Sequence, residues 1–119
     1  MKTESIIVDK SKTFAVRIVN LYKYLCNEKK EFVLSKQLLR GGISIGANVK
    51  EAIRGQSKDD FVHKMNISLK EASESEYWLE LLHETDYITE TQFGSIIADC
   101  RELIKILTSI IKSSRKEGK

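Results

Sequence analysis

The sequence is poor in the residues that interrupt regular structure, since it has no proline and only 6 glycines among 119 residues. Charged residues make up 31% of the chain and are spread along it. This composition argues against a disordered chain, a collagen-like chain, or several domains joined by linkers. We therefore expect a single all-α domain that covers residues 1–119.

Long apolar runs are missing as well. No stretch approaches the ~18 apolar residues that a helix needs to cross a bilayer. The first residues also lack the apolar core and the small-residue cleavage site of a signal peptide. We expect a cytoplasmic protein without a membrane partner.

Residues typical of catalytic or metal sites are scarce. Cys26 and Cys100 fall on predicted helices without Cys-x-x-Cys spacing, which favours buried reduced thiols over a disulfide or a metal site. His63 and His83 belong to one predicted helix, and no serine lies in a nucleophile turn, so the chain assembles no Ser-His-Asp set. We expect no enzymatic activity, no cofactor and no metal.

Four segments show apolar residues at three- and four-residue steps, the pattern of amphipathic helices. The short connections between them place consecutive helices antiparallel, which predicts an up-down-up-down four-helix bundle. The residues expected to face its core are Phe14, Ile18, Leu21 and Leu25, then Leu38, Gly42, Ile45, Val49, Ala52 and Ile53, then Phe61, Met65, Ser68, Ala72 and Leu79, and finally Phe93, Ile96, Ile97, Cys100, Leu103, Ile104, Leu107, Ile110 and Ile111.

The first helix, expected over about residues 9–27, has an apolar arc wider than one side of a small bundle requires. Two interpretations stay open: either this helix is deeply buried, or part of it meets another subunit. The residues that widen the arc are Val8, Ala15, Val19, Tyr22 and Cys26.

Capping residues mark the ends of the other three helices. Ser35 and Ser57 are predicted N-caps of the second and third helices, because a serine hydroxyl accepts a hydrogen bond from a free amide of the first turn. Thr89 and Gln92 have the spacing of a capping box, which opens the fourth helix. Gly55 is expected to take the left-handed conformation that ends the second helix.

Two polar stripes stand out on the second and third helices. The antiparallel register puts Arg40 level with Glu74 and predicts an ion pair between them, while Glu51 comes level with residues 62–64. A solvated face has no need of Trp78, which favours a subunit seam. An ordinary surface explains the other stripe residues equally well, so both interpretations stay open. The stripes consist of Arg40, Ser44, Asn48 and Glu51 on one helix and of Ile67, Glu71, Glu74, Trp78 and Leu81 on the other.

The net charge of +3 is unevenly distributed, because residues 71–90 contain seven carboxylates and no lysine or arginine. The bundle topology gathers eleven cations against six carboxylates at one end, which includes an expected frayed tail over residues 113–119. Such a patch can hold phosphates, although plain solubility explains it too. The cations are Lys2, Lys10, Lys12, Lys50, Arg54, Lys58, Lys64, Lys112, Arg115, Lys116 and Lys119.

Several motifs resemble one family closely over residues 14–111. They are Gln37-Leu38-x-Arg40, Ser44-Ile45-x-x-Asn48-x-x-Glu51-Ala52, Ser57-Lys58-x-x-Phe61 and Glu74-x-x-Tyr77-x-Leu79. The chain resembles the bacterial four-helix-bundle proteins encoded by intervening sequences in large-subunit ribosomal RNA genes. It is also similar to the accessory variability protein of diversity-generating retroelements.

The resemblance implies a left-handed bundle that assembles into a ring-like homopentamer without established enzymatic activity. It also implies a nucleic acid and a reverse transcriptase as partners. On this hypothesis RNA or DNA binds at the basic end, through residues that we choose from charge alone: Lys50, Arg54, Lys58 and Lys64. The competing hypothesis is a protein-interaction scaffold without affinity for nucleic acid.

Overall fold

The computed structural model describes residues 2–117 of the chain and side chains from residue 4 to residue 115. Within this range the chain forms four helices and no strand, which confirms the all-α prediction. The helices are α1 (Lys2–Asn27), α2 (Leu34–Ile53), α3 (Lys58–Glu84) and α4 (Glu90–Glu117). No helix in the described part of the chain is long and apolar enough to cross a membrane.

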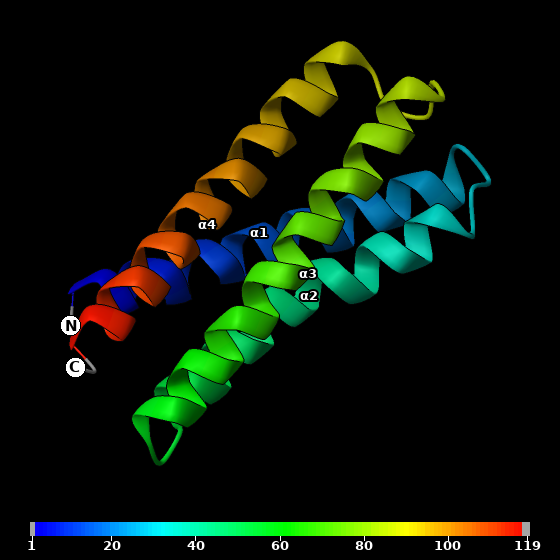
Figure 1. Ribbon diagram of the computed structural model, residues 1–119. Helices are drawn as coiled ribbons and strands as arrows, with labels where there is room; N and C mark the ends of the chain where they lie inside the picture. The colour runs from blue at the N-terminus through cyan, green and yellow to red at the C-terminus, as the bar shows by residue number, and fades with distance from the viewer. Residues whose placement is uncertain (1, 118–119) are drawn as a thin grey trace.

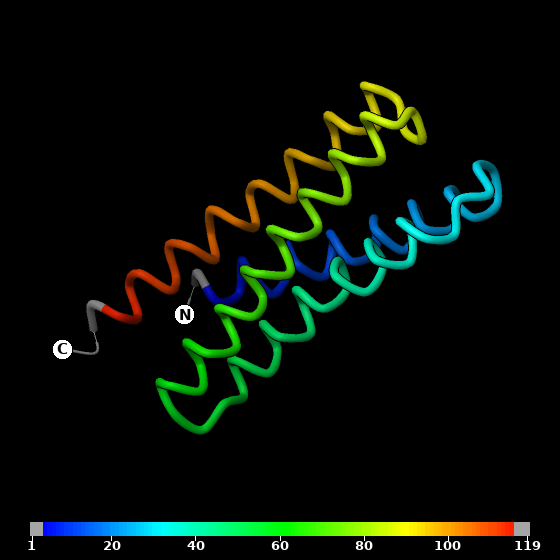
Figure 2. Tube along the Cα trace, turned by 45° about the vertical axis from the view of Figure 1, so that its right-hand side comes forward, coloured from blue at the N-terminus to red at the C-terminus, as the bar shows by residue number. Residues whose placement is uncertain are grey.

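The helices form a rod of 49 × 21 × 19 Å in which the chain reverses direction at each connection (Figures 1 and 2). Each helix packs against its neighbours in sequence, and α4 returns to a smaller contact with α1. Cross-helix contacts fit antiparallel pairs, since the hydroxyl of Ser68 donates to the carbonyl of Ile45 while the Gly41 backbone lies against Ser75. The left-handed twist stays a prediction.

The core follows the predicted stripes with few exceptions. The largest side chains with almost no exposed surface come from all four helices, among them Phe14, Leu38, Met65 and Leu107. Ile53 was wrongly expected inside: it lies 38% exposed in the last turn of α2, because Ala52 occupies the buried side of that turn. Apolar burial of this kind supplies most of the stability of a small bundle.

Glycines in α2 allow the helices on both sides to approach it closely. A Cβ atom at Gly42 would lie 2.8 Å from both Cγ1 and Cγ2 of the fully buried Ile18 on α1. A Cβ atom at Gly41 would lie 3.2 Å from the Ser75 hydroxyl on α3. The cost of glycine in a helix, about 1 kcal/mol against alanine, is thus offset by close packing at the centre of the bundle.

Two of the predicted caps are confirmed. The Ser57 hydroxyl accepts a hydrogen bond from the Asp60 amide at 3.1 Å and starts α3. Thr89 and Gln92 form the reciprocal capping box of α4, with the Thr89 amide donating to Gln92 at 2.8 Å and the Gln92 amide donating to Thr89 at 3.1 Å. These caps satisfy amides that a helix cannot pair internally.

The predicted cap at Ser35 is wrong, because Glu31 performs this role. The Glu31 carboxylate accepts hydrogen bonds from the amides of Val33, Leu34 and Ser35 at 3.2, 2.9 and 2.7 Å. Ser35 is buried, and its hydroxyl donates to the Glu31 carbonyl at 2.8 Å. A longer side chain placed four residues earlier reaches the same amides, which serine-based capping rules do not anticipate.

The remaining helix ends also differ from expectation. Gly55 does not take a left-handed conformation, which Lys30 (φ 53°) and Asp86 (φ 68°) adopt in the other two connections. α1 begins at Lys2 rather than near residue 9, because Ile7 is fully buried and extends the apolar stripe towards the N-terminus. Most of the predicted tail is helical, since α4 continues to Glu117, and residues 118–119 lie outside the described residues.

Two glycine substitutions test the close approach of α1 and α2. Gly42→Ala should lower the free energy of unfolding by about 1–3 kcal/mol, because the new methyl group overlaps the buried Ile18 side chain. Gly94→Ala is the matched control, since Gly94 is exposed and a Cβ there meets nothing within 4 Å. The control should raise stability by up to about 1 kcal/mol through helix propensity. Urea unfolding of both variants measures the difference, and equal effects would contradict tight α1–α2 packing.

Glu31 makes stability depend on pH. Burial opposes ionisation of this carboxyl, but the hydrogen bonds from Leu34, Ser35 and Val33 outweigh it and lower the pKa of Glu31. Ionised Glu31 therefore contributes fully to the free energy of unfolding above the ordinary glutamate pKa of about 4.3. This contribution is lost as pH falls through the lowered pKa of the folded protein. Glu31→Gln should cost about 1–2 kcal/mol at pH 7 and progressively less in acid. Thermal unfolding between pH 2.5 and 7 measures this, with the exposed Glu28→Gln as a control expected to stay near wild type.

Candidate nucleic-acid interface

One end of the rod gathers three segments that are distant in sequence. Figures 1 and 2 place the start of α1, the α2–α3 connection and the end of α4 at the same end of the molecule. The other two connections lie at the opposite end. The bundle thus gathers the predicted cations of these segments at one end, which we call the basic end.

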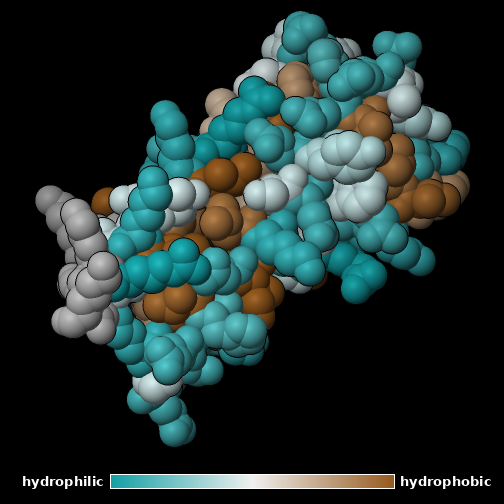
Figure 3. Space-filling model, in the orientation of Figure 1, coloured by the Kyte–Doolittle hydropathy of each residue, from teal (hydrophilic) through white to brown (hydrophobic). Residues whose placement is uncertain are grey.

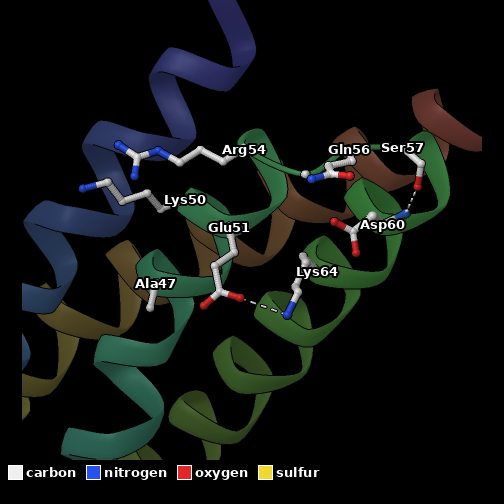
Figure 4. Close-up of a pocket in the computed structure, with 9 residues that line it drawn as sticks. Ala47, Lys50, Glu51, Arg54, Gln56, Ser57, Asp60 and Lys64 are labelled. Carbon is white, nitrogen blue, oxygen red and sulfur yellow. Dashed lines mark hydrogen bonds and ion pairs between the residues drawn. The ribbon is translucent and has the colours of Figure 1, made fainter.

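An open hollow of about 840 Å³ lies at the basic end, where α2 turns into α3. Three of the four residues predicted to bind nucleic acid line it: Lys50, Arg54 and Lys64. Figure 4 shows the side chains of Lys50 and Arg54 extending together to one side of α2. Lys58 is exposed in the first turn of α3 but does not line the hollow. The structure thus places Lys50 and Arg54 close together at the hollow, whereas Lys58 lies outside its lining.

Lys64 differs from the other predicted phosphate ligands because it is compensated. Its ammonium group lies 2.9 Å from a Glu51 carboxylate oxygen across the α2–α3 contact, where the sequence register placed Glu51 (Figure 4). The hydrogen bond and the charge of Glu51 raise the pKa of Lys64, so this side chain stays protonated. Asp60 also lines the hollow and adds a negative charge. The positive charge of the hollow therefore comes mainly from Lys50 and Arg54.

The other cations of the basic end are distributed around these two residues. Lys12, Lys112 and Arg115 are exposed, and none has an ion pair among the described side chains. Lys10 instead pairs with Glu102 on α4 at 3.2 Å, which removes it from the uncompensated set. Lys2, Lys116 and Lys119 were also predicted to belong to this end, and their side chains lie outside the described range.

The predicted polar stripes of α2 and α3 lie against each other along the rod. A second hollow, of about 230 Å³, is lined by Gln37 and Gly41 together with residues of both stripes: Arg40, Glu71, Glu74 and Trp78. The Ser44 hydroxyl donates to the Arg40 carbonyl at 2.6 Å and the Asn48 amide to the Ser44 carbonyl at 2.9 Å, so these two side chains bond along α2.

The predicted ion pair between Arg40 and Glu74 is wrong. Both residues are exposed and line the same hollow, yet the described side chains include no ion pair between them. Arg40 and Glu74 do lie at the same level of the bundle, as the antiparallel register predicted. An exposed arginine, however, gains little free energy by exchanging water for a carboxylate. Glu71 and Glu74 therefore lie next to each other, and neither forms an ion pair among the described side chains.

Hydrophobic side chains remain exposed outside the core. Val8 (36%) and Val16 (55%) of α1, with Ile43 (43%) of α2, are large apolar residues at the surface. A further exposed pair, Phe32 and Val33, belongs to the α1–α2 connection, and Figure 3 shows a brown hydrophobic patch at this end of the visible face. The wide apolar arc of the first helix was predicted, but Ile43, whose position on α2 adjoins that arc, was not.

The groups that could carry chemistry have structural partners. Burial raises the pKa of the Cys100 thiol to about 12, and this thiol donates to the Ala72 carbonyl at 3.4 Å. His83 stacks on Phe93 with ring centroids 4.2 Å apart and contacts Glu90 at 3.2 Å. Among the described side chains, no three His, Cys, Asp or Glu residues gather as a metal site requires.

Comparisons with known proteins agree with the sequence motifs. The family described as 23S rRNA-intervening sequence protein matches residues 3–109. A solved structure, that of a protein with unknown function from the S23 ribosomal protein family of Bacteroides thetaiotaomicron VPI-5482, is similar at 61% identity and a TM-score of 0.91. The match covers 92% of this chain and 98% of that chain. No curated protein matches.

The neighbouring carboxylates of the second hollow make a further pH prediction. Burial and the charge of Glu74 raise the pKa of Glu71. Ionised Glu71 therefore costs stability at neutral pH, and this cost disappears as pH falls through the raised folded value towards the ordinary pKa. Glu71→Gln should stabilise the protein by about 0.2–0.5 kcal/mol at pH 7 and by nothing near pH 4.

Urea unfolding of Glu71→Gln, Glu74→Gln and the double variant at pH 4 and pH 7 measures this effect. Each single variant should stabilise the protein at pH 7, and the double variant should gain less than the sum, because both changes relieve the same repulsion. A uniform loss of stability at both pH values would contradict the repulsion between Glu71 and Glu74.

Proposed function

The chain belongs to the 23S rRNA-intervening sequence protein family, and from that premise we propose that it is a non-enzymatic homo-oligomer that binds RNA or DNA through its basic end. The proposal depends on one observation above all. Exposed cations from α1, α2, α3 and α4 gather at the end of the rod, with Lys50 and Arg54 extending side by side from α2 (Figure 4).

The arrangement suits phosphate groups better than a small ligand. Lysine ammonium groups and the arginine guanidinium bind phosphate oxygens through charge and hydrogen bonds, whatever the base sequence. The hollow beside them is open, and no large hydrophobic or aromatic side chain lines it, whereas such side chains form the walls of most small-molecule pockets. We therefore assign the main contacts to Lys50, Arg54 and Lys58, and a weaker one to Lys64 because Glu51 already neutralises it.

The proposed oligomer is a ring of five copies, following the family resemblance. A ring with its axis along the rods brings every basic end to one side of the assembly. Such a surface concentrates positive potential and lets several copies contact one nucleic acid at once. The setting we propose is that of an accessory subunit in a ribonucleoprotein or beside a retroelement reverse transcriptase.

A second candidate function is a protein scaffold without affinity for nucleic acid. The exposed apolar residues Val8, Val16 and Ile43 favour it, because an apolar surface is typical of protein contacts and contributes nothing to phosphate binding. The two candidates differ in one measurable property. Phosphate binding releases counterions and weakens steeply with salt, whereas an apolar contact does not.

Charge reversal at the basic end tests nucleic-acid binding. Fluorescence anisotropy of a labelled 30-nucleotide RNA and of a 30-base-pair DNA is recorded between 50 and 300 mM salt. For Lys50→Glu combined with Arg54→Glu, we expect at least a tenfold loss of affinity at 100 mM salt. The slope of log K against log salt should fall by about 2 per bound protomer, because two phosphate contacts disappear.

The matched control combines Lys29→Glu with Lys30→Glu, the same change of charge at exposed positions in the α1–α2 connection at the opposite end of the rod. This control should lose much less affinity than the basic-end variant. If both variants lose affinity equally, the basic end is not the binding surface. If the wild type binds neither probe, or binds without salt dependence, the scaffold function replaces nucleic-acid binding.

A further inference from the structure

Two neighbouring sides of the bundle have complementary chemistry. The first, which we call the α1–α2 face, carries apolar residues on the outer stripes of those helices, and towards the basic end Lys50 and Arg54 extend over the same side (Figure 4). The contacts of Gly42 with Ile18 and of Gly46 with Ser11 show which side of α2 meets α1, and the stripe beside them continues outward. The face comprises Val8, Val19 and Tyr22 of α1 and Leu39, Ile43 and Ile53 of α2.

The second side, which we call the α2–α3 face, is the pair of polar stripes around the 230 Å³ hollow. Its centre is Trp78, a half-buried indole beside the exposed Tyr77, with ring centroids 5.4 Å apart. Glu71 and Glu74 line the same hollow with Arg40, and neither carboxylate forms an ion pair among the described side chains. This face thus offers an aromatic platform, a recess and an excess of one carboxylate over the single arginine that lines it.

We infer that these two faces bind each other between copies of the chain, so that the α1–α2 face of one protomer covers the α2–α3 face of the next. This inference rests on the proposed oligomer and names the surfaces through which it forms. An exposed apolar stripe gains most by burial against an aromatic and aliphatic surface. Trp78 and the half-buried Ile67 and Leu81 supply such a surface.

The levels of the residues along the rod agree with this pairing. Gly42 lies against Ile18 and Gly41 lies against Ser75, so these positions mark one level of the three helices. One turn further towards the α1–α2 connection, the same level contains Tyr22 of α1, Leu39 of α2 and Trp78 of α3. In a ring whose axis runs along the rods, neighbours sit at equal height, and Trp78 of one copy then meets Tyr22 and Leu39 of the next.

Charge supports the same partner and the same orientation. Lys23 and Lys36 are exposed at this level on the outer sides of α1 and α2, next to the α1–α2 face. On the α2–α3 face, Glu71 and Glu74 are the carboxylates that line the hollow and form no ion pair among the described side chains. The carboxylates Glu4 and Asp9 lie several turns away, near the start of α1. A lysine of one copy beside Glu74 of the next relieves the repulsion between Glu71 and Glu74.

The geometry also explains closure. Two different patches that pair head to tail generate either a ring or an open filament, depending on the rotation between copies. Both faces share α2 and occupy adjacent sides of the bundle, so their outward directions differ by roughly a right angle. A rotation of that size closes after about four or five copies.

The test disrupts each face with one substitution. Ile43→Glu places a carboxylate on the α1–α2 face at a residue that is 43% exposed, and Trp78→Ala removes the anchor of the α2–α3 face. Each variant should shift light scattering from the oligomer towards the monomer mass of 13.6 kDa, with association at least tenfold weaker. The matched control is Val33→Glu, since Val33 is 72% exposed and belongs to neither face, and it should assemble like the wild type.

A charge exchange tests the pairing of the two faces directly. Lys36→Glu and Glu74→Lys should each weaken association about tenfold, because each puts like charges opposite one another in the assembly. The chain that carries both substitutions should recover to within about threefold of the wild type. Circular dichroism of every variant identifies any that fail to fold, and those are replaced by Ile43→Lys or Trp78→Gln.

The outcomes separate this inference from the proposed function. A wild type that is monomeric at all concentrations overturns the oligomer itself, and with it the seam. An oligomeric wild type whose Ile43→Glu and Trp78→Ala variants stay assembled, or whose charge exchange brings no recovery, overturns only the assignment of the two faces. Nucleic-acid binding is measured independently, at residues of the basic end.

Discussion

The close approach of α2 to both of its neighbours is the constraint on which the rest of the structure depends. Gly42 leaves no side chain towards α1, and Gly41 leaves none towards α3, so the two flanking helices pack against bare helix backbone. Ser68 secures the same contact from the side of α3 by donating to the Ile45 carbonyl at 2.8 Å. Packing of this kind fixes both register and distance, because any shift along the helix would bring a larger side chain into the contact.

This register determines which distant residues become neighbours at the surface. It brings Glu51 within 2.9 Å of Lys64 and sets Trp78 beside the carboxylates of α3 and the polar stripe of α2. It also aligns the ends of the helices, so that cations from three segments distant in sequence lie at one end of the rod. α2 contributes to the basic end and to both faces of the proposed seam, and a change in its packing would alter all three together.

The contact between α1 and α4 is of another kind. It is smaller than the contacts between helices consecutive in sequence and includes the ion pairs of Arg17 with Asp99 at 2.6 Å and of Lys10 with Glu102 at 3.2 Å. All four side chains are partly exposed, so water and salt screen these charges and each pair adds little stability. The bundle is therefore held together mainly by the contacts of α1 with α2, of α2 with α3, and of α3 with α4.

The sequence by itself determined the four helices, most of their core residues, the caps at Ser57 and Thr89, and the level of Glu51 against residues 62–64. These features follow from apolar periodicity and short-range hydrogen bonding, which many residues specify together. Only the tertiary structure decided that Glu31 caps α2, that Arg40 leaves Glu74 unpaired, and that Lys64 is neutralised while Lys50 and Arg54 stay available. Such choices depend on the reach of single side chains and on competition with water worth about 1 kcal/mol or less, which no periodic pattern encodes.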